Sequence, residues 1–155
     1  MYKIDKIDKL ILKALSENSQ VTTTQLVPSI HLSIPAINKR IEKLKNSGII
    51  KKFTILTDAS KVGRSVSAYI SVVLDSPSRS DSFTSFALSH PSITECCTVT
   101  GNYDIIIRVS VPTIYDLENI IQELKRHQGV VKSQTYIILT EHKFKPTVLP
   151  SDDES

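Results

Sequence analysis

The sequence has no long apolar run and contains only two cysteines, Cys96 and Cys97. A membrane-spanning helix needs about 18 or more consecutive apolar residues. A secretory signal needs an apolar stretch, whereas residues 1–5 of this chain already include the charged Lys3 and Asp5. Two adjacent cysteines cannot join distant segments, and they are too few for a zinc site of spaced ligand pairs. We therefore expect a cytoplasmic protein with reduced thiols, no membrane contact, no bound metal and no cofactor.

Acidic residues are scarce in the first part of the chain. Residues 1–64 contain ten Lys and two Arg against three Asp and two Glu, a net charge of +7. Residues 65–155 contain seven basic and eleven acidic residues, a net charge of −4. This asymmetry favours a nucleic-acid-binding half joined to a different kind of unit. The overall composition, 40% hydrophobic and 23% charged, is typical of a globular protein.

The basic part contains three amphipathic segments with helix-start signals. Asp5 precedes a segment whose apolar residues recur at i, i+3, i+4 and i+7. Thr22 and Gln25 have the spacing of a capping box and open a second short helix. Ser33 is a suitable N-cap for a third helix, which should end by about Ser47. Three short helices in this layout predict a winged-helix-like helix-turn-helix whose third helix lies in the DNA major groove.

The start of the third helix would lie nearest to the base edges, where asparagine can pair with adenine and apolar groups can contact thymine methyls. Basic residues farther along would bind phosphates. The predicted DNA contacts are Ser33, Ile34, Pro35, Ala36, Asn38, Lys39, Arg40, Lys43, Lys51 and Lys52. Two alternatives stay open: the lysines form only a solvated helix face, or the three-helix unit binds another protein.

The second part of the chain alternates strand and helix patterns. Residues 48–57 read as an extended connector or a strand. The order strand, helix, strand, strand, helix, strand then follows at residues 67–74, 83–88, 93–100, 103–111, 117–124 and 130–140. This order predicts a ferredoxin-like βαββαβ domain with both helices on one face of an antiparallel sheet, and therefore an α+β fold class overall.

The uncovered face of that sheet should carry too much apolar and aromatic surface to remain in water. Its predicted members are Tyr69, Val73, Ile106, Tyr136 and Ile138. Burial against a second copy is the expected solution, and a two-fold homodimer would present two DNA-reading helices to an inverted repeat in double-stranded DNA.

Short motifs along nearly the whole chain resemble the Lrp/AsnC (feast/famine) regulators. They are Asp5-x-x-Asp8-x-x-Ile11-Leu12, Leu32-Ser33, Arg40-Ile41-x-x-Leu44, Gly48-Ile49-Ile50, Pro91-x-Ile93-x-Glu95-Cys96, Val99 to Asp104, Gly129-Val130-Val131 and Thr135-Tyr136. Three positions depart from the pattern. Pro28 interrupts the second helix, His31 replaces a usual glycine, and Asn102 stands where an acid is common.

The resemblance implies a transcription regulator whose dimers assemble into tetramers or octamers and whose small-molecule effector, mostly an amino acid, binds between dimers. It transfers the effector site to Thr100, Gly101, Asn102, Tyr103, Asp104 and Thr135. An exposed glycine turn suits a carboxylate, and Asp104 suits an ammonium group. The alternative is that Gly101-Asn102 is only a hairpin turn and Asp104 its local hydrogen-bond acceptor.

On this basis we expect a helix-turn-helix domain at residues 1–50, a linker at 51–64, an effector-binding and oligomerisation domain at 65–142 and a flexible acidic tail at 143–155. An enzyme is the main competing interpretation, because siroheme decarboxylases resemble the same architecture. Residues 65–155 contain three His and three Arg, spread without a recognisable catalytic grouping. We therefore assign no catalytic residue. A partner-binding module without DNA affinity would predict a neutral first half.

Overall fold

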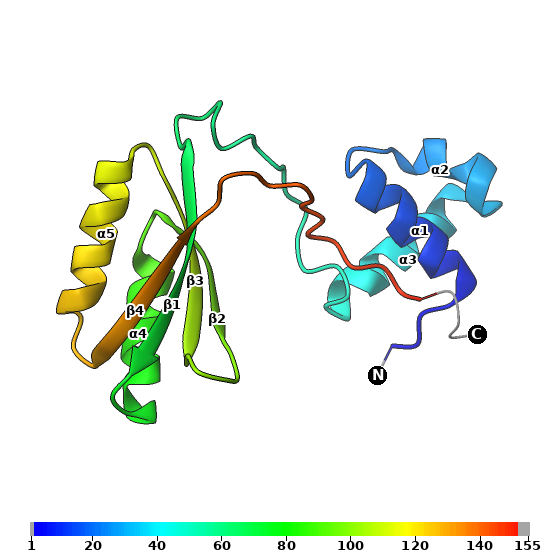
Figure 1. The fold of residues 1–155 in the computed structure, drawn as a ribbon. Coiled ribbons are helices and arrows are strands. Elements are labelled where there is room, and N and C mark those ends of the chain that lie inside the picture. The colour runs from blue at the N-terminus through cyan, green and yellow to red at the C-terminus, as the bar shows by residue number, and fades with distance from the viewer. Residues whose placement is uncertain (1, 152–155) are drawn as a thin grey trace. The chain divides into compact units, whose positions relative to one another are not determined.

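The computed structural model describes residues 2–151 and divides the chain into two compact units. One unit comprises Met1–Leu56 together with Lys143–Ser155, and the other comprises Thr57–His142. The first is helical and the second contains a sheet with helices (Figure 1), so the α+β fold class is confirmed. None of the helices between residues 2 and 151 has the length and apolar composition needed to cross a bilayer.

Three α-helices form the N-terminal unit: α1 (Lys6–Glu17), α2 (Thr23–Ile30) and α3 (Ile34–Asn46). The predicted caps open the first two helices. Asp5 caps α1, and Thr22 caps α2 in a capping box with Gln25. The helices bury one shared core, which consists of Ile11, Leu26, Ile30, Ile37 and Leu44. The predicted helical layout of this unit is therefore correct.

The end of α2 carries two unusual backbone features. Pro28 lies inside the helix, where it has no N–H for the carbonyl of Thr24, and α2 is only eight residues long. His31 then adopts φ 57° and ψ 37°, and it is the one described non-glycine residue with positive φ. A side chain with a Cβ costs roughly 1–2 kcal/mol in this left-handed region. The turn between α2 and α3 is therefore strained.

Arg40 on α3 contacts two carboxylates at the start of α1. Its Nη1 lies 2.6 Å from Oδ2 of Asp5 and 2.9 Å from Oδ1 of Asp8. The side chain of Asp8 is 1% exposed and also accepts a hydrogen bond from the Tyr2 hydroxyl. Burial raises the pKa of Asp5, but hydrogen bonds from the Asp8 N–H and from Arg40 outweigh burial and hold that pKa below its usual value. We call Tyr2, Asp5, Asp8 and Arg40 the α1–α3 ion-pair cluster.

The C-terminal unit contains a four-stranded antiparallel sheet with the order β2-β3-β1-β4. Its elements in chain order are β1 (Val66–Leu74), the 3-10 helix η1 (Pro77–Arg79), α4 (Ser80–Ser89), β2 (Ile93–Thr98), β3 (Ile105–Val111), α5 (Ile114–Arg126) and β4 (Val130–Ile137). The predicted βαββαβ order is confirmed, and the strand order is that of a ferredoxin-like domain.

The two faces of this sheet differ because side chains alternate along each strand. Helices α4 and α5 cover one face (Figure 1), where they pack against buried residues of β1 and β3. The central residues of that core are Ala68, Ile70, Val72, Phe83, Ile105, Ile107, Val109, Leu117 and Leu124. The opposite face, called the outer face from here on, carries the alternate residues, which include Tyr69, Ser71, Val73, Ile106, Arg108, Lys132, Gln134 and Tyr136.

The outer face exposes aromatic surface, as predicted. Tyr69 is 37% exposed, and Tyr136, its partner in the β1–β4 register, is 50% exposed. Val73 and Ile106 lie on the same face and are half-buried. The predicted Ile138 follows the end of β4.

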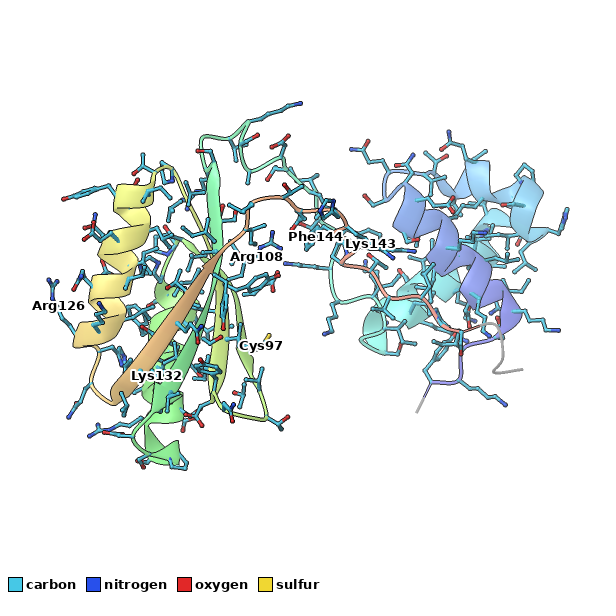
Figure 2. The ribbon with its side chains drawn as sticks, in the orientation of Figure 1. Cys97, Arg108, Arg126, Lys132, Lys143 and Phe144 are labelled. Carbon is cyan, nitrogen blue, oxygen red and sulfur yellow. The ribbon has the colours of Figure 1, made fainter. Side chains whose placement is uncertain are left out.

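Arg108 of β3 also lies on the outer face and was not among its predicted members (Figure 2). Its Nη2 lies 2.5 Å from Oε1 of Glu141, and its Nη1 lies 3.6 Å from Oε1 of Glu95. The guanidinium carbon lies 5.6 Å from the centre of the Tyr69 ring. Two carboxylates and an aromatic ring therefore compensate the charge of Arg108 within one chain.

Two further segments bear on the sequence predictions. Residues 48–57 contain no strand. Of the two predictions for this segment, an extended connector or a strand, the connector is therefore correct. The described part of the predicted tail, residues 143–151, belongs to the N-terminal unit, where Nζ of Lys9 donates to the carbonyl of Ser151 over 2.6 Å. The predicted flexibility of residues 143–155 stays a prediction, and residues 152–155 lie outside the described chain.

Replacing His31 with glycine should stabilise the N-terminal unit by about 1 kcal/mol, because glycine adopts positive φ without a Cβ penalty. Gly48→Ala is the inverse control. Gly48 has φ +77° and open space around it, so the added methyl should cost a similar amount through backbone strain alone. Hydrogen–deuterium exchange of α2 and α3 amides in the full chain measures both changes. If the α2 and α3 amides of His31→Gly exchange at the wild-type rate while those of Gly48→Ala exchange faster, the backbone at His31 is not strained.

Replacing Arg40 with methionine should destabilise the N-terminal unit by about 2 kcal/mol, because Asp8 would keep a buried carboxylate without its cation. Asp5 has a lowered pKa when folded, so its stabilising contribution is present above the unfolded pKa and is lost as pH falls through the folded pKa. When the pH falls below about 4, the free energy of unfolding should therefore decrease less in Arg40→Met than in the wild type. Amide exchange in α1 at neutral and acid pH measures this, with Lys39→Met as the matched control. Equal exchange in both variants would refute the role of the cluster.

Candidate DNA interface and effector site

The first turns of α3 form an exposed surface at the predicted base-reading residues. Ile37 and Leu44 are buried in the helical core, so the opposite side of α3 faces solvent. Ser33, the N-cap, makes no side-chain capping hydrogen bond, which leaves its hydroxyl available to a partner. Among the predicted contacts on and just before α3, Ala36 and Arg40 are half-buried. The others are exposed, namely Ser33, Ile34, Pro35, Asn38, Lys39 and Lys43.

Asn38 is held by a residue of α2 that the sequence analysis did not select. The Thr23 hydroxyl donates to Oδ1 of Asn38 over 2.7 Å. This bond orients the amide and leaves its two N–H donors and one oxygen lone pair for another partner. Adenine offers a matching acceptor and donor in the major groove. The geometry therefore allows Asn38 to read a base while Thr23 fixes its orientation.

The predicted phosphate contacts fall into two groups. Lys43, Lys51 and Lys52 are exposed and make no ion pair with any carboxylate between residues 2 and 151. Arg40 differs because its Nη1 already contacts Asp5 and Asp8. A guanidinium has five N–H donors, so Nη2 and Nε of Arg40 can still meet a phosphate. The Asp5-x-x-Asp8 spacing was the signal in the sequence for this ion-pair cluster.

The predicted effector turn connects β2 to β3. Val99 donates its N–H to the carbonyl of Asp104 over 2.9 Å, which closes the turn. Gly101 has φ +119°, a conformation that suits glycine, and no atom lies within 4 Å of the position of a Cβ. Thr100, Gly101 and Asn102 are exposed. The backbone at the tip of the turn is therefore open to a ligand.

Asp104 ties the turn to β1. Its N–H donates to the carbonyl of Val72 over 2.9 Å, and its Oδ2 accepts from the N–H of Leu74 over 2.8 Å. The local hydrogen-bond role that the sequence left open for Asp104 is therefore present. A carboxylate has about four acceptor positions, so this bond leaves capacity for an ammonium group. The two roles of Asp104 are compatible.

Tyr103 extends from the turn to residues of β4 that the sequence analysis did not select. Its hydroxyl donates to Oε1 of Gln134. The Nζ of Lys132 lies 5.8 Å from the centre of the Tyr103 ring. Lys132 and Gln134 pair with Val73 and Ser71 of β1 and lie on the outer face. Sequence spacing gave no sign of this contact, because it depends on the β1–β4 register.

Thr135 lies on the other side of the sheet. It pairs with Ile70, which is fully buried under the helices, and its own side chain alternates with that of Gln134. Tyr103 and Thr135 therefore do not meet on one face. A contribution of Thr135 to the effector site would come from the helix-covered side of β4.

The predicted effector residues do not line a small pocket that lies in this unit. That pocket has a volume of about 100 Å³ and lies between α4 and β2, where its lining residues are Ala87, Leu88, Ile93, Thr94, Glu95 and Cys96. Burial raises the pKa of the Cys96 thiol, so the neutral form is favoured. No group of three or more potential metal ligands occurs among residues 2–151.

In a comparison with known proteins, a separate family model matches each unit. Residues 67–148, more than half of the chain, match the Lrp/AsnC ligand binding domain, and residues 4–51 match a winged helix-turn-helix DNA-binding family. The HTH-type transcriptional regulator FL11 of Pyrococcus horikoshii is 32% identical over 147 residues, which cover 95% of this chain and 96% of that protein. The regulatory protein AsnC of Haemophilus influenzae is 29% identical over 145 residues and covers 89% of this chain and 97% of its own.

The fold agrees with the same family. The structure of E. coli AsnC superimposes with a TM-score of 0.88 at 29% identity and covers 96% of this chain and 100% of its own. The matched relatives are regulators and not enzymes by name. The chain therefore belongs to the Lrp/AsnC family, as a transcription regulator with a helix-turn-helix DNA-binding domain followed by an Lrp/AsnC ligand-binding domain.

Proposed function

We propose that this regulator binds an inverted repeat as a homodimer through α3, and that a small metabolite, with amino acids as the first class, changes its assembly or its operator affinity. The observation that carries the DNA part is the exposed start of α3 within a segment of net charge +7. The predicted contacts from Ser33 to Lys52 remain the proposed interface. Dimers would assemble further into tetramers or octamers, as the family resemblance implies.

In this proposal, base reading falls to the first turns of α3, and phosphate binding falls to the rest of α3 and the connector that follows it. Asn38 and Lys39 lie in the first turns, the part of a recognition helix that meets base edges. Thr23 orients Asn38. Lys43, Lys51 and Lys52 supply sequence-independent attraction to the backbone, and Arg40 adds a phosphate contact through its remaining donors.

The outer face supports the homodimer. Tyr69 and Tyr136 expose large aromatic side chains on the sheet of a small domain, and Val73 and Ile106 continue the apolar surface. Arg108 does not oppose burial because Glu95 and Glu141 already compensate its charge. A second copy has the same face, so a two-fold contact buries both.

The turn from Thr100 to Asp104 supports effector binding. Backbone N–H groups around Gly101 suit a carboxylate, and Asp104 has acceptor capacity for an ammonium group. These two groups are the complements of an amino-acid zwitterion. Thr135 stays in the proposed set through the family resemblance alone.

The purified protein should bind a duplex with a short inverted repeat, and its affinity should fall steeply with salt because lysines and arginines displace counterions. Fluorescence anisotropy with duplexes selected from a random pool measures this. Asn38→Ala and Lys39→Ala should change the preferred sequence, with a loss of about 1–3 kcal/mol of discrimination per base contact. Lys51→Ala should weaken all duplexes equally and reduce the salt slope by about 1.

The control for these DNA measurements is Lys125→Ala, which removes an exposed charge from α5 in the other unit and should change neither quantity. If no selected duplex binds more tightly than random DNA at low salt, the DNA-reading proposal is wrong. If Lys125→Ala weakens binding as much as Lys51→Ala, the assignment of phosphate binding to the N-terminal unit fails.

Light scattering at micromolar concentration should give a dimer or a multiple of it, because the outer face needs a partner. Ile106→Asp places a charge on that face and should produce a 17.3 kDa monomer or an insoluble chain. Tyr115→Asp is the matched control, since Tyr115 is 71% exposed at the start of α5, away from the outer face. A monodisperse wild-type monomer, or an undiminished dimer in Ile106→Asp, would overturn the interface.

A further inference from the structure

Three consecutive threonines lie at the start of α2, and their side chains have different surroundings. The hydroxyl of Thr22 accepts from the N–H of Gln25 and closes the cap of the helix. Thr24 is exposed to solvent. The hydroxyl of Thr23 instead donates to Oδ1 of Asn38 on α3 over 2.7 Å. Of the three, Thr23 is therefore the threonine whose hydroxyl bonds to the proposed base-reading residue.

Apolar packing fixes the two helices that carry Thr23 and Asn38 against each other. Leu26 lies about one turn after Thr23 on α2 and is buried in the helical core, and Ile37 directly precedes Asn38 and is fully buried. The core therefore sets the backbone positions on both sides of the hydrogen bond. A neutral hydrogen bond between side chains near the surface adds little to stability, because water replaces it when it is lost. Its consequence lies in the orientation of the Asn38 amide.

The orientation of an asparagine amide decides which purine it can read. In the major groove adenine presents the N7 acceptor beside the N6 amino donor, whereas guanine presents two acceptors, N7 and O6. An amide reads adenine with its nitrogen toward N7 and its oxygen toward N6. In the same orientation its oxygen meets O6 of guanine and is repelled. An amide that is held in place therefore cannot rotate to relieve this repulsion.

We propose that Thr23 is a positioning residue that makes Asn38 selective for adenine, so that each half-site of the operator carries adenine at the base pair that Asn38 contacts. The inference rests on the proposed DNA-reading function of α3 and names the base that this function recognises. Oδ1 accepts from Thr23 through one lone pair and keeps the second for the N6 amino group, and the amide N–H₂ can donate to N7.

Binding of the full-length protein to duplexes that differ only at the contacted base pair tests this role. The parent duplex is one selected from a random pool, and the contacted pair is the one at which Asn38→Ala loses its preference. The wild type should bind the adenine duplex about tenfold more tightly than the guanine duplex, as expected for a bidentate contact. Thr23→Val keeps the branched shape without the hydroxyl, and it should reduce this ratio by at least about threefold while affinity for random DNA is unchanged.

Three further variants separate positioning from a general effect on the helix. Thr23→Ser restores the hydroxyl and should restore the adenine preference, whereas Thr23→Ala should lose it as Thr23→Val does. Thr24→Val is the matched control, because it changes the neighbouring exposed threonine of the same helix and should behave as the wild type. In the Asn38→Ala background, Thr23→Val should have no further effect on the ratio, because Thr23 acts only through Asn38.

The outcomes distinguish this role from the DNA-reading proposal on which it rests. If the contacted base is not adenine, or if Thr23→Val and Thr23→Ala keep the full ratio, the positioning role is wrong and DNA reading by α3 stands. A further loss of preference from Thr23→Val in the Asn38→Ala background would also refute it, because Thr23 would then act without Asn38. If no selected duplex binds more tightly than random DNA, DNA reading itself is wrong and the role of Thr23 fails with it.

Discussion

The alternation of side chains along β1, β3 and β4 is the constraint on which the C-terminal unit depends. Because α4 and α5 cover one face of the sheet, every second residue of these strands lies in the core and the others lie on the outer face. A shift of one residue in the β1–β4 register would move Lys132, Gln134 and Tyr136 under the helices. The core residues Ile70 and Val72 fix that register, so packing on one face sets the chemistry of the other.

Polar contacts help to hold the helices of the N-terminal unit together, whereas the C-terminal sheet is held by apolar packing. Its helices are short and share few buried apolar residues, so the α1–α3 ion-pair cluster adds a direct connection between the first and the third helix. Arg40 belongs to this connection and also to the proposed phosphate contacts. A phosphate near Arg40 would compete with or share the donors that Asp5 and Asp8 use. In the proposed interface, DNA binding and the stability of the unit would therefore be linked at Arg40.

The helices and strands could be predicted from the sequence, but the polar contacts between residues far apart in the chain could not. Capping boxes at Asp5 and Thr22 and the alternation in β1 are local patterns, so the helices and the sheet order could be predicted. The contacts of Thr23 with Asn38 and of Tyr103 with Gln134 join residues that are far apart in the chain. Such pairs depend on helix packing and strand register, which composition and spacing do not encode.

The same reason explains the placement of Thr135 and Arg108. The family resemblance put Thr135 with the turn, but its register partner Ile70 places it on the helix-covered face, opposite Gln134. Arg108 interrupts an outer face that was predicted from its apolar members alone. Its charge is compatible with that face because Glu95, on the neighbouring strand, and Glu141, beyond β4, contact it. Neither carboxylate can be connected to Arg108 before the sheet is assembled.

Tyr103 gives the proposed effector a physical route to assembly. The residue begins in the turn, where the ligand would bind, and its ring lies with Lys132 and Gln134 on the outer face, where the second copy would bind. A ligand that displaces Tyr103 would therefore alter the proposed dimerisation surface itself. Typical coupling energies of about 1–3 kcal/mol would change operator affinity by roughly 5–150-fold. The proposed dimer would set the spacing of its two α3 helices, and half-sites about 34 Å apart would be read only when that spacing matches. A displacement of Tyr103 on this surface would thus connect metabolite binding to DNA recognition without a long pathway through either core.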